Sequence, residues 1–300
     1  MLISFDSQSF FSSKIRSFNK KNLLKKLSRY TYPLLHRSSS GPKNFMIDLI
    51  QAIEINNLAD TTFNFFNSDT HILNAGFYTF IWEKTQPKKK KRVIIRLDGI
   101  GLDSENINFN KVRANFNRII NRGSFLVYQS KFSKNCFNNT YESLPPGKVI
   151  YNGSVDLGDN IFKSTKFLRN INDEFNGEFY TLAGRFSSRK RIYEITKEFN
   201  KYNLGNLVVM SNVPNDLKFK NKRIIYLGMI NSELARIIIA SSLGLIHFDR
   251  YDWCPNIVVG AISDGIPVIC SNYGGTPEIV GRSGLIIKEF PDNLSHNLEG

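Results

Sequence analysis

DRYDWCPNIVVGAISDGIPVICSNYGG, residues 249–275, is the stretch that decides the fold. An apolar run ends just before it, and an acid-bearing loop then leads into a helix that begins near Asn256, with Pro255 well placed at the helix start. The glycine and proline at 265–267 end this helix and lead into the next strand. A glycine-containing loop, 272–275, follows that strand. Strand, helix and strand in this order predict a βαβ unit with parallel strands.

The same alternation extends outward along the chain. In the second half we expect strands at 179–183, 207–210, 224–227, 243–247, 267–270 and 284–287, and helices at 188–200, 231–241, 256–264 and 276–280. In the first half we expect strands at 62–66, 93–97, 125–129 and 149–151, and helices at 76–84, 106–121 and 131–139. Two such blocks in 300 residues predict an α/β protein with two doubly wound, Rossmann-like domains that face a cleft. Such sheets bind ligands at the carboxyl ends of their strands.

Charge and composition divide the chain into three parts. We expect a basic extension at 1–29, an N-terminal domain at 30–165 and a C-terminal domain at 166–300. Residues 1–150 carry 23 basic and 10 acidic side chains, or +13 of the total net charge of +14. This asymmetry indicates an anionic partner for the first half. The alternative is compositional drift, because the chain is rich in Lys, Asn, Ile and Phe.

Two basic segments have specific candidate partners. Residues 14–29 interleave basic and apolar side chains at helical spacing, which predicts contact with an anionic membrane surface. The alternative for that segment is a solvated extension. The run Lys88–Lys91 resembles a nuclear-localisation or nucleic-acid-binding sequence. The alternative there is a solvated loop that leads into the strand at 93–97.

Several function classes lack their sequence signals. No apolar run reaches the ~20 residues that a membrane span needs, and no signal peptide is recognisable at the start. The three cysteines form no CxxC pair, which argues against a disulfide framework or a zinc site and favours a reducing, cytoplasmic compartment. No zincin, Walker A, nucleophile-elbow or dinucleotide-binding motif occurs. We therefore expect no metal and no resident cofactor.

The segment AGRFSSRKR, residues 183–191, carries the clearest phosphate-binding pattern. It follows an expected strand and opens a helix, and it places Arg185 and Lys190 beside a helix N-terminus, which attracts anions. The alternative is a solvated helix start. In the loop at 249–252, Asp249 and Asp252 could hold ligand hydroxyl groups, or could cap the following helix.

Together these segments resemble the retaining glycosyltransferases of family 4, which have the GT-B fold. The resemblance covers about residues 30–290 and is strongest after 180. Its motifs in the second half are Gly184-Arg185 with Lys190, the CPN loop at 254–256, AISDGIPV at 261–268, GGTPEIV at 274–280 and GLII at 284–287. The looser motifs in the first half are RSSSGPKNF at 37–45, RLDG at 96–99, YQSKFSK at 128–134 and YNGSVD at 151–156.

The resemblance implies roles for individual residues. Arg185 and Lys190 would neutralise the diphosphate of a nucleotide-sugar, and Asp252 would hold the donor sugar as the first acid of a degenerate E-x7-E motif. The second acid is replaced by Gly260, which would remove a ribose contact. Asp98 would line the acceptor side of the cleft. The residues expected to bind the donor are Gly184, Arg185, Lys190, Asn256, Ile257, Val258 and Gly260.

The implied function is metal-independent transfer of a sugar from a nucleotide-sugar, with retention, to a sugar, lipid-linked or protein acceptor. Members of the family usually continue for several helices beyond the last strand, and this sequence stops at Gly300, so a closing element would be missing. One alternative is an inactive relative that binds a sugar nucleotide or a partner protein. A second is a nucleic-acid-binding protein, which the pI of about 9.6 favours and the lack of a recognition motif disfavours.

Overall fold

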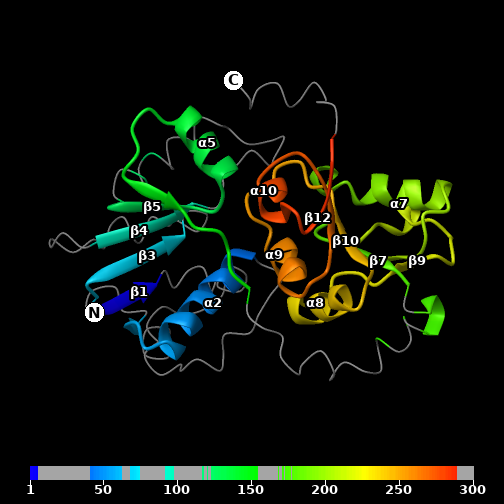
Figure 1. Ribbon diagram of the computed structural model, residues 1–300, viewed down its shortest axis with the longest axis horizontal. Coiled ribbons are helices and arrows are strands. Elements are labelled where there is room, and N and C mark those ends of the chain that lie inside the picture. The colour runs from blue at the N-terminus through cyan, green and yellow to red at the C-terminus, as the bar shows by residue number, and fades with distance from the viewer. Residues whose placement is uncertain are drawn as a thin grey trace, which may run out of the picture. The chain divides into compact units, whose positions relative to one another are not determined.

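The computed structural model describes residues 1–5, 41–62, 68–74, 92–97, 117, 120, 123–154, 168, 171, 173–176 and 178–288 (Figure 1). The chain divides into two compact units, Met1–Tyr151 and Asn152–Gly300. Each unit contains a six-stranded sheet, and the strands of both sheets pair in parallel. The expected fold class, two doubly wound α/β domains, is confirmed. In the described part of the chain, no helix combines the length and the apolar character needed to cross a bilayer.

The sheet of the second unit has the strand order β12-β11-β10-β7-β8-β9. Its strands are β7 (Tyr180–Ala183), β8 (Leu207–Met210), β9 (Ile224–Tyr226), β10 (Gly244–His247), β11 (Val268–Ser271) and β12 (Gly284–Ile287). The chain adds β8 and β9 on one side of β7, and then returns to add β10, β11 and β12 on the other. The strand order therefore reverses between β7 and β10, which is where doubly wound sheets bind their ligands.

Helices cover both faces of this sheet. They are α7 (Ile192–Lys201), α8 (Ser232–Ala240), α9 (Asn256–Ser263) and α10 (Thr276–Val280), with short 3-10 turns η7 (Ser188–Lys190) and η8 (Asn215–Leu217). Because side chains alternate along a strand, Val208 faces the cluster that includes α8, α9 and α10, and Val209 faces the cluster that includes α7. All four residues of β8 are buried, as expected for an interior strand of a parallel sheet.

The sheet of the first unit has the order β2-β1-β3-β4-β5-β6. Its strands are β1 (Leu2–Phe5), β2 (Asp60–Thr62), β3 (Thr70–Asn74), β4 (Arg92–Leu97), β5 (Phe125–Tyr128) and β6 (Gly147–Val149). The helices that the structure describes from end to end in this unit are α2 (Gly41–Ile55) and α5 (Lys131–Thr140). Met46, Ile50 and Ile53 of α2 pack on Ile3 and Ile72 of the sheet. Ser130 caps α5 by accepting the N–H of Ser133 at 3.0 Å.

The structure differs from the sequence expectations mainly in the first unit. Residues 1–29 are not an extension throughout, because Leu2–Phe5 pairs with β2 on one side and with β3 on the other. A strand was expected at 62–66; β2 ends at Thr62, and residues 63–66 lie outside the described residues. The units divide after Tyr151, where we expected a boundary after residue 165. Residues 14–29, Lys88–Lys91 and Asp98 lie outside the described residues.

All three cysteines are free and buried. Cys136 lies on α5, Cys270 lies on β11, and Cys254 precedes α9. Burial raises the pKa of Cys136 and of Cys270 to about 11. At neutral pH these two thiols are therefore almost entirely protonated.

The position of β1 makes a testable difference to stability. Ile3 is 7% exposed within the core under α2, whereas Ile55, at the end of α2, is 77% exposed. We expect Ile3→Ala to lower the free energy of unfolding of the first unit by about 2–4 kcal/mol, because it removes buried apolar atoms from the sheet. Ile55→Ala is the matched control, and it should stay within about 0.5 kcal/mol of the parent. Urea unfolding of the two variants makes the comparison, and equal values would mean that β1 is not part of the core.

Candidate functional site

The candidate site lies at the carboxyl ends of β7 and β10, at the reversal of strand order. Gly244 pairs with Tyr180 and Ile246 with Leu182, so the two strands end level with each other. The turn η7 follows β7, and the loop at 248–253 follows β10. The register therefore brings two chain segments together that are about 60 residues apart in sequence.

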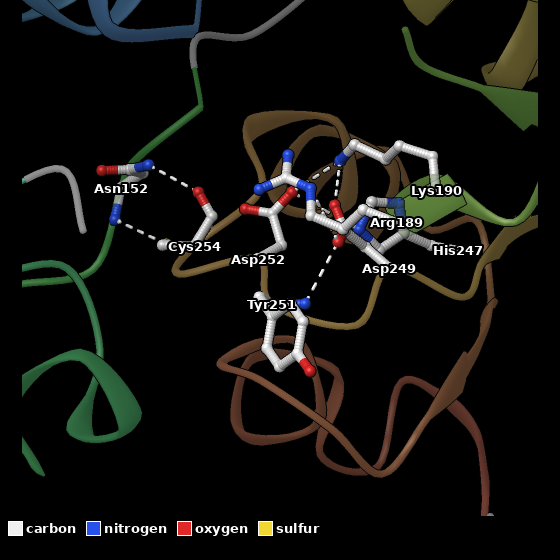
Figure 2. A network of polar contacts seen from close by, with 8 residues as sticks. All are labelled: Asn152, Arg189, Lys190, His247, Asp249, Tyr251, Asp252 and Cys254. Atoms are coloured by element: carbon white, nitrogen blue, oxygen red, sulfur yellow. Dashed lines mark hydrogen bonds and ion pairs between the residues drawn. The ribbon is translucent and has the colours of Figure 1, made fainter. Parts of the chain in front are cut away.

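A cluster of two cations and two carboxylates joins these segments (Figure 2). Lys190 Nζ lies 2.8 Å from Asp252 Oδ2 and also pairs with the carboxylate of Asp249. Arg189 Nε lies 3.3 Å from Asp249 Oδ1, and the backbone N–H of Tyr251 donates to the same oxygen at 3.1 Å. The Asp249 side chain is fully buried. With two positive and two negative groups, the cluster is neutral as a whole.

The cluster sets the protonation states of its members. Burial alone would lower the pKa of Lys190, but the charges of Asp252 and Asp249 outweigh burial and raise it. Burial alone would raise the pKa of Asp252, but the neighbouring basic groups, Lys190 foremost, together outweigh burial and hold that pKa well below its usual range. For Asp249 burial prevails over Lys190, and its pKa is raised. At neutral pH, Lys190 and Asp252 form a fully charged pair.

His247 borders the cluster from the last position of β10. Its Nε2 lies 3.7 Å from Asp252 Oδ2. Burial, together with the nearby Lys190 ammonium, lowers its pKa to about 3. The imidazole is therefore neutral at pH 7, and this contact is not an ion pair.

The side chains of His247, Asp249 and Asp252 also bring their potential ligand atoms within 4.8 Å of one another. Among the described residues this group has a composition that could hold a metal ion. Lys190 already contacts both carboxylates, however, and Arg189 contacts one of them. A metal ion would have to displace the ammonium group, so we interpret the group as part of an ion-pair cluster.

The loop after β11 holds the backbone of Asp252 through a hydrogen bond. The backbone N–H of Gly275 donates to the carbonyl oxygen of Asp252 at 2.7 Å. Gly274 has φ of 72°, and a Cβ there would lie 2.8 Å from the same carbonyl oxygen. Only glycine satisfies both the backbone conformation and the close approach. The two glycines that were singled out as a loop signal therefore position Asp252.

The structure brings together some of the expected site residues and not others. Lys190 and Asp252 are in direct contact, and Gly184 lies against Lys190, since a Cβ there would be 3.5 Å from Lys190 Cδ. Arg185 is exposed and forms no ion pair with another described residue. Arg189, which the sequence analysis did not single out, is the arginine that pairs with Asp249.

The start of α9 contains three of the residues that we expect to bind the donor. The N–H of Val258 donates to the carbonyl oxygen of Pro255 at 3.0 Å, and the Val258 side chain is fully buried in the core. Ile257 is partly buried against the same core cluster. Asn256 differs from both, because its side-chain Oδ1 accepts a hydrogen bond from Asn152 at 2.6 Å.

Gly260 faces a residue that the sequence analysis did not consider. A Cβ at this position would lie 3.5 Å from Cδ and Nε of Arg236 on α8. The Arg236 guanidinium is paired with Asp264 at the end of α9, with Nε 2.7 Å from Oδ2. An acidic side chain at 260 would therefore begin beside a guanidinium group, in competition with Asp264.

Comparisons with known proteins support the fold. No protein-family model matches the chain, and no curated protein matches it in sequence. Among solved structures, a sucrose-phosphate synthase from Thermosynechococcus elongatus is 13% identical, with a TM-score of 0.62 over 100% of this chain and 88% of that one. Anabaena HepE, solved in complex with UDP-glucose, is 15% identical, with a TM-score of 0.60 over 99% and 88%. The trehalose-6-phosphate protein from E. coli, bound with UDP-2-fluoro glucose, is 11% identical, with a TM-score of 0.52 over 94% and 73%. At these identities the similarity establishes the shared GT-B fold.

The surroundings of Gly260 predict the effect of adding one methyl group. Gly260→Ala should raise the free energy of unfolding of the second unit by about 0.5–1 kcal/mol, because alanine is the better helix former. The new Cβ would meet Arg236 only at ordinary contact distance. Urea unfolding measures the change. A loss of stability would mean that the Arg236 side chain cannot accommodate the methyl group.

Neutral, buried His247 predicts a dependence of stability on pH. Its pKa is about 3 in the folded protein, against 6.5 for an unperturbed histidine. The unfolded chain therefore binds a proton that the folded protein does not, and stability falls as the pH drops from about 6.5 toward 3. Between pH 7 and pH 5 this residue alone should cost the second unit about 2 kcal/mol of unfolding free energy.

The control for this pH dependence is His247→Gln, which does not titrate in that range. Urea unfolding at pH 7 and at pH 5 gives, for the parent and for the variant, the unfolding free energy lost between the two pH values. The difference between the two losses is the contribution of His247. Equal losses in the two proteins would show that His247 is not held neutral.

Proposed function

We propose that this protein transfers a sugar from a nucleotide-sugar to an acceptor, and that the second unit binds the donor. The single observation that carries the proposal is the position of the Lys190 cluster. It lies where strand order reverses in the second sheet of a GT-B fold, and the exposed Arg185 belongs to the same chain segment as Lys190. In doubly wound sheets this is the ligand-binding edge. The resemblance to family 4 places the donor diphosphate at the same segment.

The cluster suits a leaving group that departs as a diphosphate. Lys190 Nζ has three protons, and the two carboxylates account for two contacts, with 15% of the side chain exposed. Asp252, whose side chain is 19% exposed, could receive the hydroxyl groups of the donor sugar. Fixed charges of this kind stabilise developing negative charge without reorganisation during the reaction. No metal-bound step is needed in this scheme.

Within the site, Arg185 and Lys190 have different roles. Lys190 and Arg189 together balance two carboxylates, so the charge of Lys190 is not in excess. Arg185 is exposed beside Gly184 and has no ion pair with a described residue, so it can add net positive charge for a diphosphate. We propose that Lys190 orients the donor and that Arg185 supplies the charge that favours diphosphate over nucleoside. The acceptor, whether sugar, lipid-linked or protein, would meet the first unit, and Asp98 stays our proposed acceptor-side residue.

Gly260 favours a second candidate function, binding of a sugar nucleotide without turnover. The position lacks the carboxylate that the resemblance implies, and Arg236 lies beside it. The two functions differ in one measurement. Release of nucleoside diphosphate from a nucleotide-sugar, followed with and without acceptors, supports transfer. Binding with no release supports the inactive relative.

The proposal predicts a ligand-specific effect of Arg185→Ala. Loss of a charge-assisted hydrogen bond should weaken binding of a nucleoside diphosphate about 10- to 100-fold and leave binding of the matching nucleoside unchanged. The probes are UDP, GDP and ADP with their nucleosides, first in a thermal-shift screen and then by calorimetry. Because Arg185 is exposed, the variant should unfold at the same temperature as the parent.

Arg223→Ala is the matched control, since Arg223 is also exposed but directly precedes β9, at the amino edge of the sheet. It should leave both affinities unchanged. Equal losses of diphosphate and nucleoside affinity in Arg185→Ala would place the diphosphate elsewhere. No binding of any diphosphate by the parent would overturn the proposed function.

A further inference from the structure

Asn152 is the first residue of the second unit, and it is buried where its neighbours are not. Its exposed fraction is 6%, whereas that of Tyr151 is 42% and Gly153 is also exposed. A single buried amide between exposed residues needs partners for its polar atoms, because unpaired buried polar groups are costly. Three of its contacts are made with one other segment of the chain.

That segment is Cys254–Asn256, which links the Asp252 loop to α9 (Figure 2). Asn152 Nδ2 donates to the carbonyl oxygen of Cys254 at 2.8 Å and to Oδ1 of Asn256 at 2.6 Å. The backbone N–H of Asn152 approaches Cys254 Sγ at 3.4 Å. One asparagine thus makes three contacts with a segment more than 100 residues away.

The segment that Asn152 contacts is adjacent to the candidate site. Asp252 lies two residues before Cys254, and its backbone is held on the other side by Gly275. The Asp252 loop is therefore supported at two points, by the loop after β11 and by Asn152. Asn256 is the first residue of α9, so the hydrogen bond from Asn152 also holds the start of that helix.

We propose that Asn152 is a positioning residue, which holds Cys254–Asn256 and through it the Asp252 carboxylate of the donor site. The inference deepens the proposed function and rests on it for the nature of the ligand. Asn152, the first residue of the second unit, therefore ties the start of that unit to the segment Cys254–Asn256 through hydrogen bonds. Asn152 itself need not touch the ligand.

The test uses Asn152→Asp in the full chain. The change keeps the shape of the side chain and removes both N–H donors of Nδ2, so the carboxylate oxygen in that position would face two acceptors, the carbonyl oxygen of Cys254 and Oδ1 of Asn256. We expect hydrogen exchange of the backbone amides at 253–258 to rise at least about 10-fold. We also expect the affinity for the nucleoside diphosphate that stabilises the parent, among UDP, GDP and ADP, to fall about 10-fold.

Asn206→Asp is the matched control. Asn206 Nδ2 also donates to a backbone carbonyl, that of Glu178, at 2.8 Å, but this bond is exposed to solvent, and the half-buried Asn206 precedes β8 at the amino edge of the sheet. This variant should change neither the exchange at 253–258 nor the affinity. Asn256→Asp, which keeps an acceptor for Asn152, should retain the protection of 253–258 against exchange.

The outcomes separate this inference from the proposed function. Unchanged exchange at 253–258 in Asn152→Asp would overturn the inference whatever the ligand. Faster exchange with unchanged diphosphate affinity would also overturn it, since Asn152 would then be purely structural. If the parent binds none of the three diphosphates, the proposed function fails, and faster exchange confined to 253–258 still supports the fastening of this loop by Asn152.

Discussion

The pairing of Lys190 with Asp249 and Asp252 is the interaction on which the second unit depends. An isolated buried carboxylate costs several kcal/mol, so Asp249 can be buried only with its cations in place. The lysine comes from the loop after β7 and the acids from the loop after β10. Their contact therefore requires β7 and β10 to be neighbours with level ends. The charge balance of the site thus requires the strand order in which β7 and β10 are neighbours, which is the order that reverses at this point.

The fold class could be predicted from the sequence because its main signals are local. Leu207–Met210 is a short, wholly apolar run, and the structure buries every residue of it. The helix at 256–263 has a proline before it and a glycine after it, and both ends were located within a residue. The strand Leu2–Phe5 was missed because four residues give too little periodicity and the segment that follows is basic. The order of strands could not be derived at all, since pairing between distant segments leaves no local pattern.

The site was only partly predictable, for a related reason. Parallel sheets place loops at a known edge, so both segments that form the cluster could be singled out from the sequence. The sequence SSRKR at 187–191 offers three consecutive cations, and nothing in the pattern decides which of them face inward. In the structure Arg191 adopts a left-handed conformation with φ of 51° between η7 and α7, and Arg189 and Lys190 reach the acids. Asn152 was not a candidate because its partners are more than 100 residues away.

The rates at which the buried cysteines react with a thiol reagent report local opening of the protein. Thiol reagents react with the thiolate, and a shielded thiol of high pKa reacts only when its surroundings open. Cys136 samples α5 in the first unit, Cys270 samples the second sheet, and Cys254 samples the loop that Asn152 holds. Because the chain has only these three cysteines, the rate at which each is alkylated in the native protein would map the free energy of opening at three separate places. Each of these regions thus contains one native thiol whose alkylation rate measures local opening, without any engineered label.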